Sequence, residues 1–105
     1  MGAAAAPLIL PKGLKAADEA RKPLTMGFIG MGKQNGGLMR NFLSRGTKVA
    51  AVCDVDSNRR NNAKKSVDEY YKGKGVANEC VATAKYEDII ERDDIDAVCI
   101  ATPDH

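Results

Sequence analysis

A short apolar run followed at once by closely spaced glycines constrains this chain more than any other feature. The run Thr25-Met-Gly-Phe-Ile29 has the composition of a buried strand, and Gly30, Gly32 and Gly36 follow it. Gly30 suits a tight turn at backbone angles that a side chain resists. Gly32 has no Cβ, so a pyrophosphate can approach the main chain, where the first N–H groups of the next helix attract its charge. The pattern therefore predicts a strand, a dinucleotide-binding turn and a helix.

The spacing of the third glycine departs from the usual fingerprint. That fingerprint, G-x-G-x-x-G, places a glycine where this chain has Asn35, and Gly36 comes one residue later. A small residue there normally lets the helix lie against the strand. A glycine-rich loop without any ligand is the alternative interpretation. The preceding strand, and an acidic residue at the expected distance, favour the nucleotide-binding one.

That acidic residue is Asp54, which ends the apolar run 48–54 and lies 24 residues after Gly30. A carboxylate at this point of a βαβ unit accepts hydrogen bonds from the adenosine ribose. Asp54 could instead be a polar strand end or a helix cap, but Asp56 is better placed to cap the next helix. Arg59 and Arg60 open that helix and are either solvated surface charge or contacts for the adenine or a 2′-phosphate. A carboxylate at Asp54 repels such a phosphate, so NAD is favoured over NADP.

Composition bounds the remaining possibilities. The 105 residues allow one domain at most, and the formal net charge of +2 gives no nucleic-acid footprint. No apolar run of about twenty residues suggests a membrane span. The three cysteines lack metal-ligand spacing, and the single histidine has no partner histidine, so no metal site is predicted. Cys53 and Cys99 lie in apolar runs, where a free thiol acts as a small buried hydrophobe.

Residues 1–23 differ from the rest of the chain. An alanine run and the segment Pro7-Leu-Ile-Leu-Pro11 precede a charged stretch without an amphipathic period. This composition predicts an extension that is flexible or lies on the surface. It also looks like the end of an export signal, although no twin arginine or adequate hydrophobic core precedes it. The location of the protein therefore stays open, with the cytoplasm favoured over export.

Strands and helices alternate through residues 24–105, which predicts an α/β fold with a parallel, Rossmann-like sheet and right-handed crossovers. We expect the strand order 3-2-1-4, with the ligand crevice at the carboxyl ends of strands one and four. The first helix ends at Gly46 in a left-handed cap, and the last helix packs Tyr86, Ile89 and Ile90. The expected strands are 24–29, 48–54, 80–84 and 95–101, and the later helices are 57–71 and 86–91.

These residues together resemble the N-terminal part of the Gfo/Idh/MocA family, which includes glucose–fructose oxidoreductase and inositol dehydrogenase. The likeness is carried by the glycine segment 27–36, by Ala51-Val-Cys-Asp54-Val-Asp56 with Arg59, and by the segment 86–105, which ends in Ala-Thr-Pro-Asp-His. The resemblance implies a partial NAD(P)-binding Rossmann domain over residues 24–105. It further implies an oxidoreductase that acts on a sugar or polyol CH–OH group, with a small sugar-like substrate and a homo-oligomeric form.

The resemblance also assigns roles to residues. Asp54 faces the adenosine ribose, and Thr102 and Pro103 lie on the nicotinamide side, although they could be only the turn that ends a strand. The family's catalytic lysine lies in a Glu-Lys-Pro segment that would follow His105, so no catalytic residue is assigned and the chain alone is expected to be inactive. The glycine-turn part of the cofactor-binding set is Gly30, Gly32, Lys33, Gln34, Asn35 and Gly36.

A second hypothesis makes the chain a non-enzymatic nucleotide-binding or interaction module. Its basis is the strand expected at 95–101, which would lie unpaired at a sheet edge and invite pairing with another chain.

Overall fold

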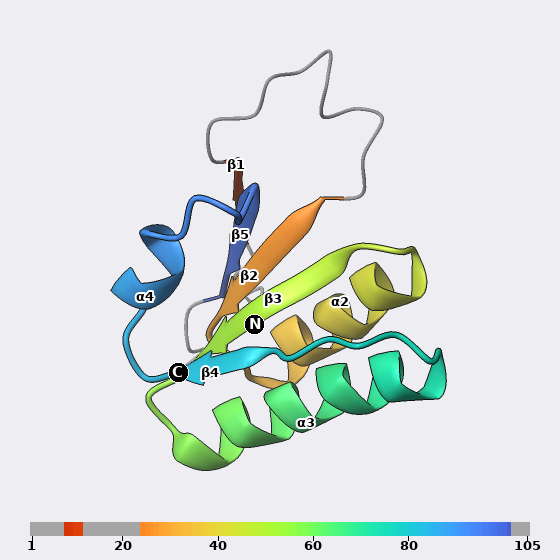
Figure 1. The fold of residues 1–105 in the computed structure, drawn as a ribbon. Coiled ribbons are helices and arrows are strands. Elements are labelled where there is room, and N and C mark those ends of the chain that lie inside the picture. The colour runs from red at the N-terminus through yellow and green to blue at the C-terminus, as the bar shows by residue number, and fades with distance from the viewer. Residues whose placement is uncertain (1–7, 12–23, 102–105) are drawn as a thin grey trace, which may run out of the picture.

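The computed structural model describes residues 8–11 and 24–101, and its centre is a five-stranded sheet of order β1-β5-β2-β3-β4 (Figure 1). Strands β2, β3, β4 and β5 run parallel, and β1 pairs with β5 in the antiparallel direction. The expected order 3-2-1-4 corresponds to β4-β3-β2-β5 and is confirmed. The strands are β1 Leu8–Pro11, β2 Thr25–Ile29, β3 Lys48–Cys53, β4 Val81–Thr83 and β5 Ala97–Ile100.

Two long helices cover one face of the sheet and a short helix covers the other (Figure 1). Helices α2 (Lys33–Ser44) and α3 (Ser57–Gly73) share one face, and α4 (Glu87–Ile90) lies on the opposite face. This is the layered α/β architecture expected from the sequence. Within the described residues, no helix is both long and apolar enough to cross a bilayer.

Each face has its own apolar core. On the α2 and α3 side, Phe28 of β2 and Val52 of β3 are fully buried with Met39 and Val67 of the helices. On the α4 side, Ile89 is fully buried in a smaller cluster, which is completed by Ala50, Ala51, Cys53, Ile95 and Val98. Strands buried on both faces are apolar nearly throughout, which explains the run 49–53.

Strand β1 was not anticipated from the sequence. Its four residues pair with β5 in a register that sets Leu8 opposite Ile100 and Pro11 opposite Ala97. The hypothesis that β5 lies at an open sheet edge is therefore wrong, because β1 satisfies the backbone groups along that edge. The four residues are exposed, and the rest of segment 1–23 lies outside the described residues.

Two local expectations also need correction. Helix α3 continues to Gly73, two residues past its expected end, because a left-handed residue first occurs at Gly75. In α4 only Ile89 is buried, whereas Tyr86 and Ile90 are exposed. A four-residue helix makes just over one turn, so one side chain can face the sheet while its neighbours point away.

Candidate dinucleotide site at the carboxyl edge of the sheet

The turn after β2 depends on Gly30, which lies between the ends of two neighbouring strands. Its φ is +85°, and its N–H donates to the Cys53 carbonyl at 2.8 Å. A Cβ at this position would lie 2.2 Å from the Ala101 carbonyl oxygen. Both the backbone angle and the space therefore require glycine, as the sequence predicted for a tight turn.

Gly32 is the N-cap of α2, and the space beside it is open. Its backbone is extended, with φ −72° and ψ −177°, and a Cβ built on it would meet no atom of the described residues within 4 Å. No side chain in the described part of the chain caps this helix. The first hydrogen bond within the helix runs from the Gly36 N–H to the Gly32 carbonyl. The preceding first-turn N–H groups, including those of Lys33 and Gln34, therefore have no partner within the helix.

Asp54 lies directly after β3 and holds the glycine turn from the side. Its Oδ2 accepts the Met31 N–H at 2.7 Å, and its Oδ1 accepts the Asp56 N–H at 2.9 Å. Its exposed fraction is 9%, and among the described residues its carboxylate forms no ion pair. The Arg60 guanidinium lies beside it and donates to the Asp54 backbone carbonyl at 3.2 Å. Each carboxylate oxygen accepts more than one hydrogen bond, so Asp54 can still accept from a ligand hydroxyl.

Asn35, which stands in place of the expected third glycine, points into the protein and is 1% exposed. Its Nδ2 donates to the carbonyls of Gly30 at 2.8 Å and Ile29 at 3.3 Å. Its Oδ1 accepts the thiol of Cys99 at 3.1 Å. The contact between helix and strands is thus made at residue 35 by a hydrogen-bonded amide. Gly36 is displaced from the packing position that a third glycine would normally take, and it is only partly buried.

The three cysteines are free and buried. Burial raises the pKa of the Cys99 thiol to about 11 and that of Cys80 to about 12. Burial, with the charge of Asp54 adding to it, also raises the pKa of Cys53. The Cys99 sulfur therefore carries its proton near neutral pH and acts as the donor toward Asn35. The expectation that Cys53 and Cys99 are buried is confirmed.

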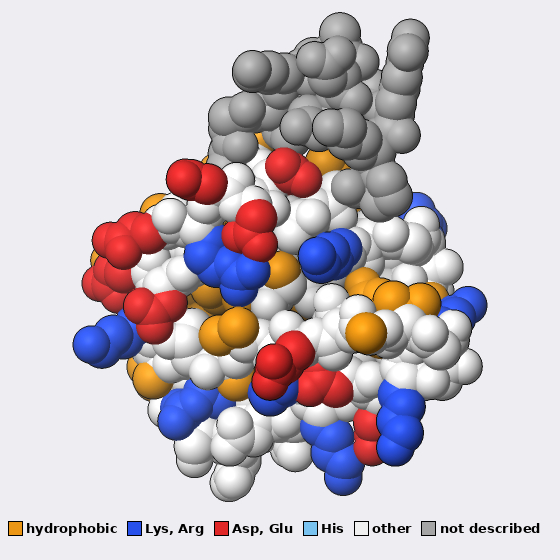
Figure 2. Space-filling model, viewed as in Figure 1, with side chains coloured by type: hydrophobic (Ala, Val, Ile, Leu, Met, Phe, Trp, Pro, Cys, Tyr) orange, Lys and Arg blue, Asp and Glu red, His pale blue; other side chains and the backbone are white. Residues whose placement is uncertain are grey.

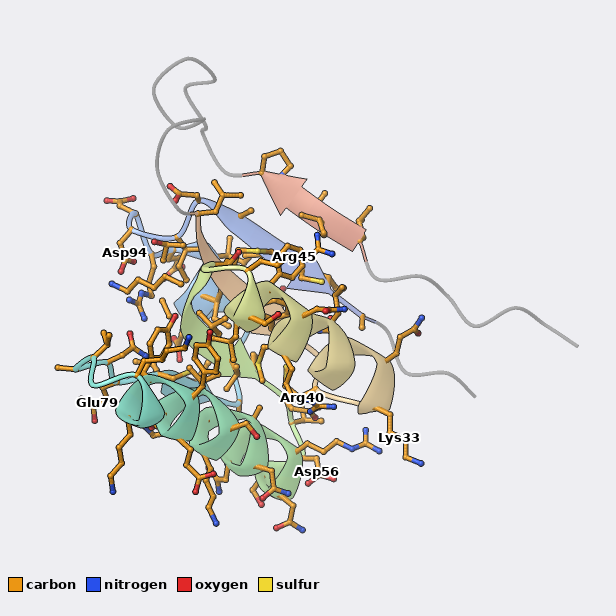
Figure 3. All side chains as sticks on the ribbon, turned by 90° about the vertical axis from the view of Figure 1, so that its right-hand side faces the viewer. Lys33, Arg40, Arg45, Asp56, Glu79 and Asp94 are labelled. Carbon is orange, nitrogen blue, oxygen red and sulfur yellow. The ribbon has the colours of Figure 1, made fainter. Side chains whose placement is uncertain are left out.

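Positive side chains gather where α2 begins. Figure 3 shows Lys33 and Arg40 at the end of the molecule where α2 and α3 start, the latter marked by Asp56. A Cβ on Gly36 would lie 3.6 Å from Arg40 Nη1, so this guanidinium lies close to the helix backbone. Arg59 is 4.0 Å from Asp56 and is largely exposed. By contrast, acidic side chains gather over the region of α4 (Figure 2). An anionic ligand is therefore favoured at the start of α2 rather than near α4.

The structure brings most of the sequence-predicted residues to one edge of the sheet. The predicted residues from Gly30 to Gly36 form the turn and the first turn of α2, Asp54 is joined to them through the Met31 N–H, and Arg59 begins α3 beside them. Thr102, Pro103 and His105 lie outside the described residues. The sequence analysis did not anticipate Arg40 or the inward orientation of Asn35. Arg40 lies one turn after Gly36, and that spacing was the only sequence signal for its position.

Curated proteins similar to this chain are named glycosyl hydrolase family 109 proteins. Glycosyl hydrolase family 109 protein 2 from Shewanella sp. (strain ANA-3) is 35% identical to this chain over 97 residues, which cover 91% of this chain and 19% of the relative. A relative from Saccharopolyspora erythraea is 31% identical over 88 residues, which cover 83% of this chain and 19% of the relative. A relative from Shewanella amazonensis is 32% identical over 79 residues, which cover 74% of this chain and 17% of the relative.

The chain thus spans about a fifth of the length of these relatives. No family model matches it. No solved structure matches it either.

Proposed function

We propose that residues 24–105 form the N-terminal part of an NAD(P)-binding Rossmann domain in an enzyme that acts on a carbohydrate. The observation that carries the proposal is the uncapped start of α2 beside the bare backbone of Gly32. Open N–H groups and the positive end of a helix form a binding site for phosphate. In this arrangement the residues from Gly30 to Gly36 bind the pyrophosphate and Asp54 binds the adenosine ribose.

The carboxylate of Asp54 supports NAD as the preferred cofactor. It lies in the same turn and forms no ion pair among the described residues, since Arg60 donates to the Asp54 backbone carbonyl and not to the carboxylate. A 2′-phosphate next to it would bring two negative charges together at low solvent exposure. Bound NAD would supply hydride transfer, and the residues of this chain would hold and orient it.

Two arguments support a carbohydrate substrate. The resemblance to the Gfo/Idh/MocA family implies oxidation or reduction at a sugar or polyol CH–OH group. The name of the relatives, glycosyl hydrolase, instead suggests cleavage of a glycosidic bond as a second candidate. Both reactions take a sugar. The non-enzymatic module loses its main support, because β1 pairs with the edge strand on which it was based.

Calorimetric titration of the 105-residue chain with NAD tests cofactor binding. The informative variant is Gly32→Val, because a Cβ at this position meets no atom of the described residues within 4 Å and the side chain enters the space proposed for phosphate. We expect a folded chain that loses at most about 1 kcal/mol of stability, because valine is a poorer N-cap than glycine. We also expect an NAD affinity at least about tenfold weaker. Gly73→Val is the matched control, because its Cβ also meets nothing and it lies at the other end of α3. Equal NAD affinity in Gly32→Val and the parent chain would contradict the proposal.

The two reactions are distinguished in a protein of the relatives' length that begins with this chain. An oxidoreductase with NAD and a free sugar accumulates NADH, which is measured by its absorbance. A glycoside hydrolase releases the aglycone without net NADH. We expect neither product from the 105-residue chain, because no acid–base catalytic residue is proposed among its described residues. Turnover by the chain alone would contradict that expectation.

A further inference from the structure

The peptide between Gly30 and Met31 is held at both of its polar atoms. The Gly30 carbonyl accepts from Asn35 Nδ2 at 2.8 Å, and the Met31 N–H donates to Asp54 Oδ2 at 2.7 Å. Because a peptide unit is planar, fixing its oxygen and its N–H fixes the plane. This plane immediately precedes Gly32, so it sets the direction in which the open backbone enters α2.

Cys99 determines which way the Asn35 amide points. Its thiol donates to Oδ1 at 3.1 Å, which leaves Nδ2 toward the carbonyls of Ile29 and Gly30. The reversed amide would place an oxygen against two carbonyl oxygens and leave the thiol without an acceptor. Cys99 is fully buried in β5, so its contact also links the turn to the neighbouring strand.

We propose that the Asn35 amide, oriented by Cys99, is a positioning residue for phosphate binding. This inference rests on the proposed function. A glycine at position 35, as in the usual fingerprint, has no side chain with which to hold the Gly30 carbonyl. In this chain the amide aligns the Gly30–Gly32 backbone with the first turn of α2, and the phosphates bind to the aligned N–H groups. The adenosine part of the ligand lies toward Asp54, whose carboxylate also accepts the Asp56 N–H and so keeps a contact outside the turn when the Asn35 amide is removed.

ADP and adenosine are the probes, because they share the nucleoside and differ by the pyrophosphate. Affinities are measured by NMR titration of the 105-residue chain. In Asn35→Ala we expect ADP affinity to fall about tenfold and adenosine affinity to change less than about twofold. Asn41→Ala is the control, an exposed asparagine on the same helix.

The cysteine provides a second pair of variants. Cys99→Ala should lower the ADP affinity about threefold, and Cys99→Ser, which keeps a hydrogen-bond donor, should restore that affinity. Cys80→Ala removes a similarly buried thiol away from the turn and controls for the cavity. The unsubstituted chain provides a test without any variant. In its NMR spectrum the Asn35 side-chain NH₂ signals should shift when ADP is added and should not shift when adenosine is added.

The outcomes separate this inference from the proposed function. A chain that binds neither NAD nor ADP overturns both. A chain that binds ADP, but whose folded variants lose ADP and adenosine affinity in parallel or lose neither, overturns only the positioning role. If Asn35→Ala does not fold, two other results decide the matter. The positioning role is overturned if the Asn35 NH₂ signals do not shift on ADP binding. It is also overturned if Cys99→Ala and Cys99→Ser bind ADP with equal affinity.

Discussion

Helices α2 and α3 begin at the same edge of the sheet, but only one of them has a capped start. At α3, Asp56 Oδ1 accepts the N–H groups of Asn58 at 2.9 Å and Arg59 at 3.3 Å. At α2, the N-cap is Gly32, and no side chain of residues 8–11 or 24–101 accepts from the first turn. The helix that follows the glycine turn therefore keeps its donors for a partner outside the described residues, whereas α3 satisfies its own.

Helices α2 and α3 have the same kind of C-terminal end, so they differ in capping only at their N-termini. Gly46 follows α2 with φ +91° and Gly75 follows α3 with φ +70°. In both cases the N–H groups of the glycine and of the residue after it donate to carbonyls of the last turn. Each helix thus has a closed Schellman end at the opposite edge of the sheet. Of the two long helices, only α2 has an open start among the described residues, and this favours a binding role for it.

The largest effect is expected at the entrance to α2. Gly30→Ala forces a Cβ to 2.2 Å from the Ala101 carbonyl oxygen at a positive φ. We expect a loss of about 4 kcal/mol or more in the free energy of unfolding, or failure to fold. Gly46→Ala has a similar φ but an open surrounding, so it should cost only about 1–2 kcal/mol. Urea denaturation measures both, and similar losses would show that the crowding at Gly30 is relieved by a small shift.

Capping α2 should separate stability from binding. Gly32→Asp places a carboxylate at an extended N-cap position, where it can accept from the first-turn N–H groups. We expect the free energy of unfolding to rise by about 1 kcal/mol and NAD affinity to fall at least about tenfold, because the new charge repels phosphate. Thermal melts and calorimetry measure the two changes. Retained NAD affinity would mean that the phosphates do not bind at this helix start.

Removing the cap of α3 should have the opposite pattern. Asp56→Ala leaves the first-turn N–H groups of Asn58 and Arg59 without their acceptor. We expect a loss of about 1 kcal/mol in stability and little change in NAD affinity. Asp56→Asn, which keeps an acceptor, is the matched control. A large loss of NAD affinity in Asp56→Ala would show that the two helix starts form one site.

The smallest effect is expected when the pH is lowered, and it should be a loss of stability at α3. Burial tends to raise the pKa of Asp68, but hydrogen bonds from Lys64 and the Cys80 N–H outweigh it and hold the pKa below its usual value of 3.8. A carboxyl with a depressed folded pKa stabilises the protein above the unfolded pKa, and the gain is lost as pH falls through the folded pKa.

Melting temperatures at pH 6 and pH 3 check this sign. The parent chain should lose more stability on acidification than Asp68→Asn, whose amide does not titrate in this range. Glu69→Gln, next to it on α3, serves as the control. Equal losses in the parent chain and Asp68→Asn would mean that this hydrogen-bonded pair does not contribute to the acid response.

The predictability of the fold followed the strength of local patterns. Apolar runs identified β2, β3 and β5, because strands buried on both faces cannot carry polar side chains. The end of α2 followed from Gly46, since glycine readily adopts the left-handed conformation. Strand β1 was missed, because three apolar residues between prolines have no period and become a strand only through pairing with β5.

For the site, the sequence predicted which residue types are present, but it did not predict the orientation of the Asn35 side chain. Sequence alone determined that Gly30, Gly32 and Asp54 meet at the end of neighbouring parallel strands, because spacing along alternating strands and helices fixes that edge. Only the tertiary structure decided that Asn35 turns inward and that the start of α2 stays uncapped. Those outcomes depend on Cys99, which is distant in sequence, and on the space around the turn. Contacts between distant segments leave no local periodicity, so they appear only once the chain has folded.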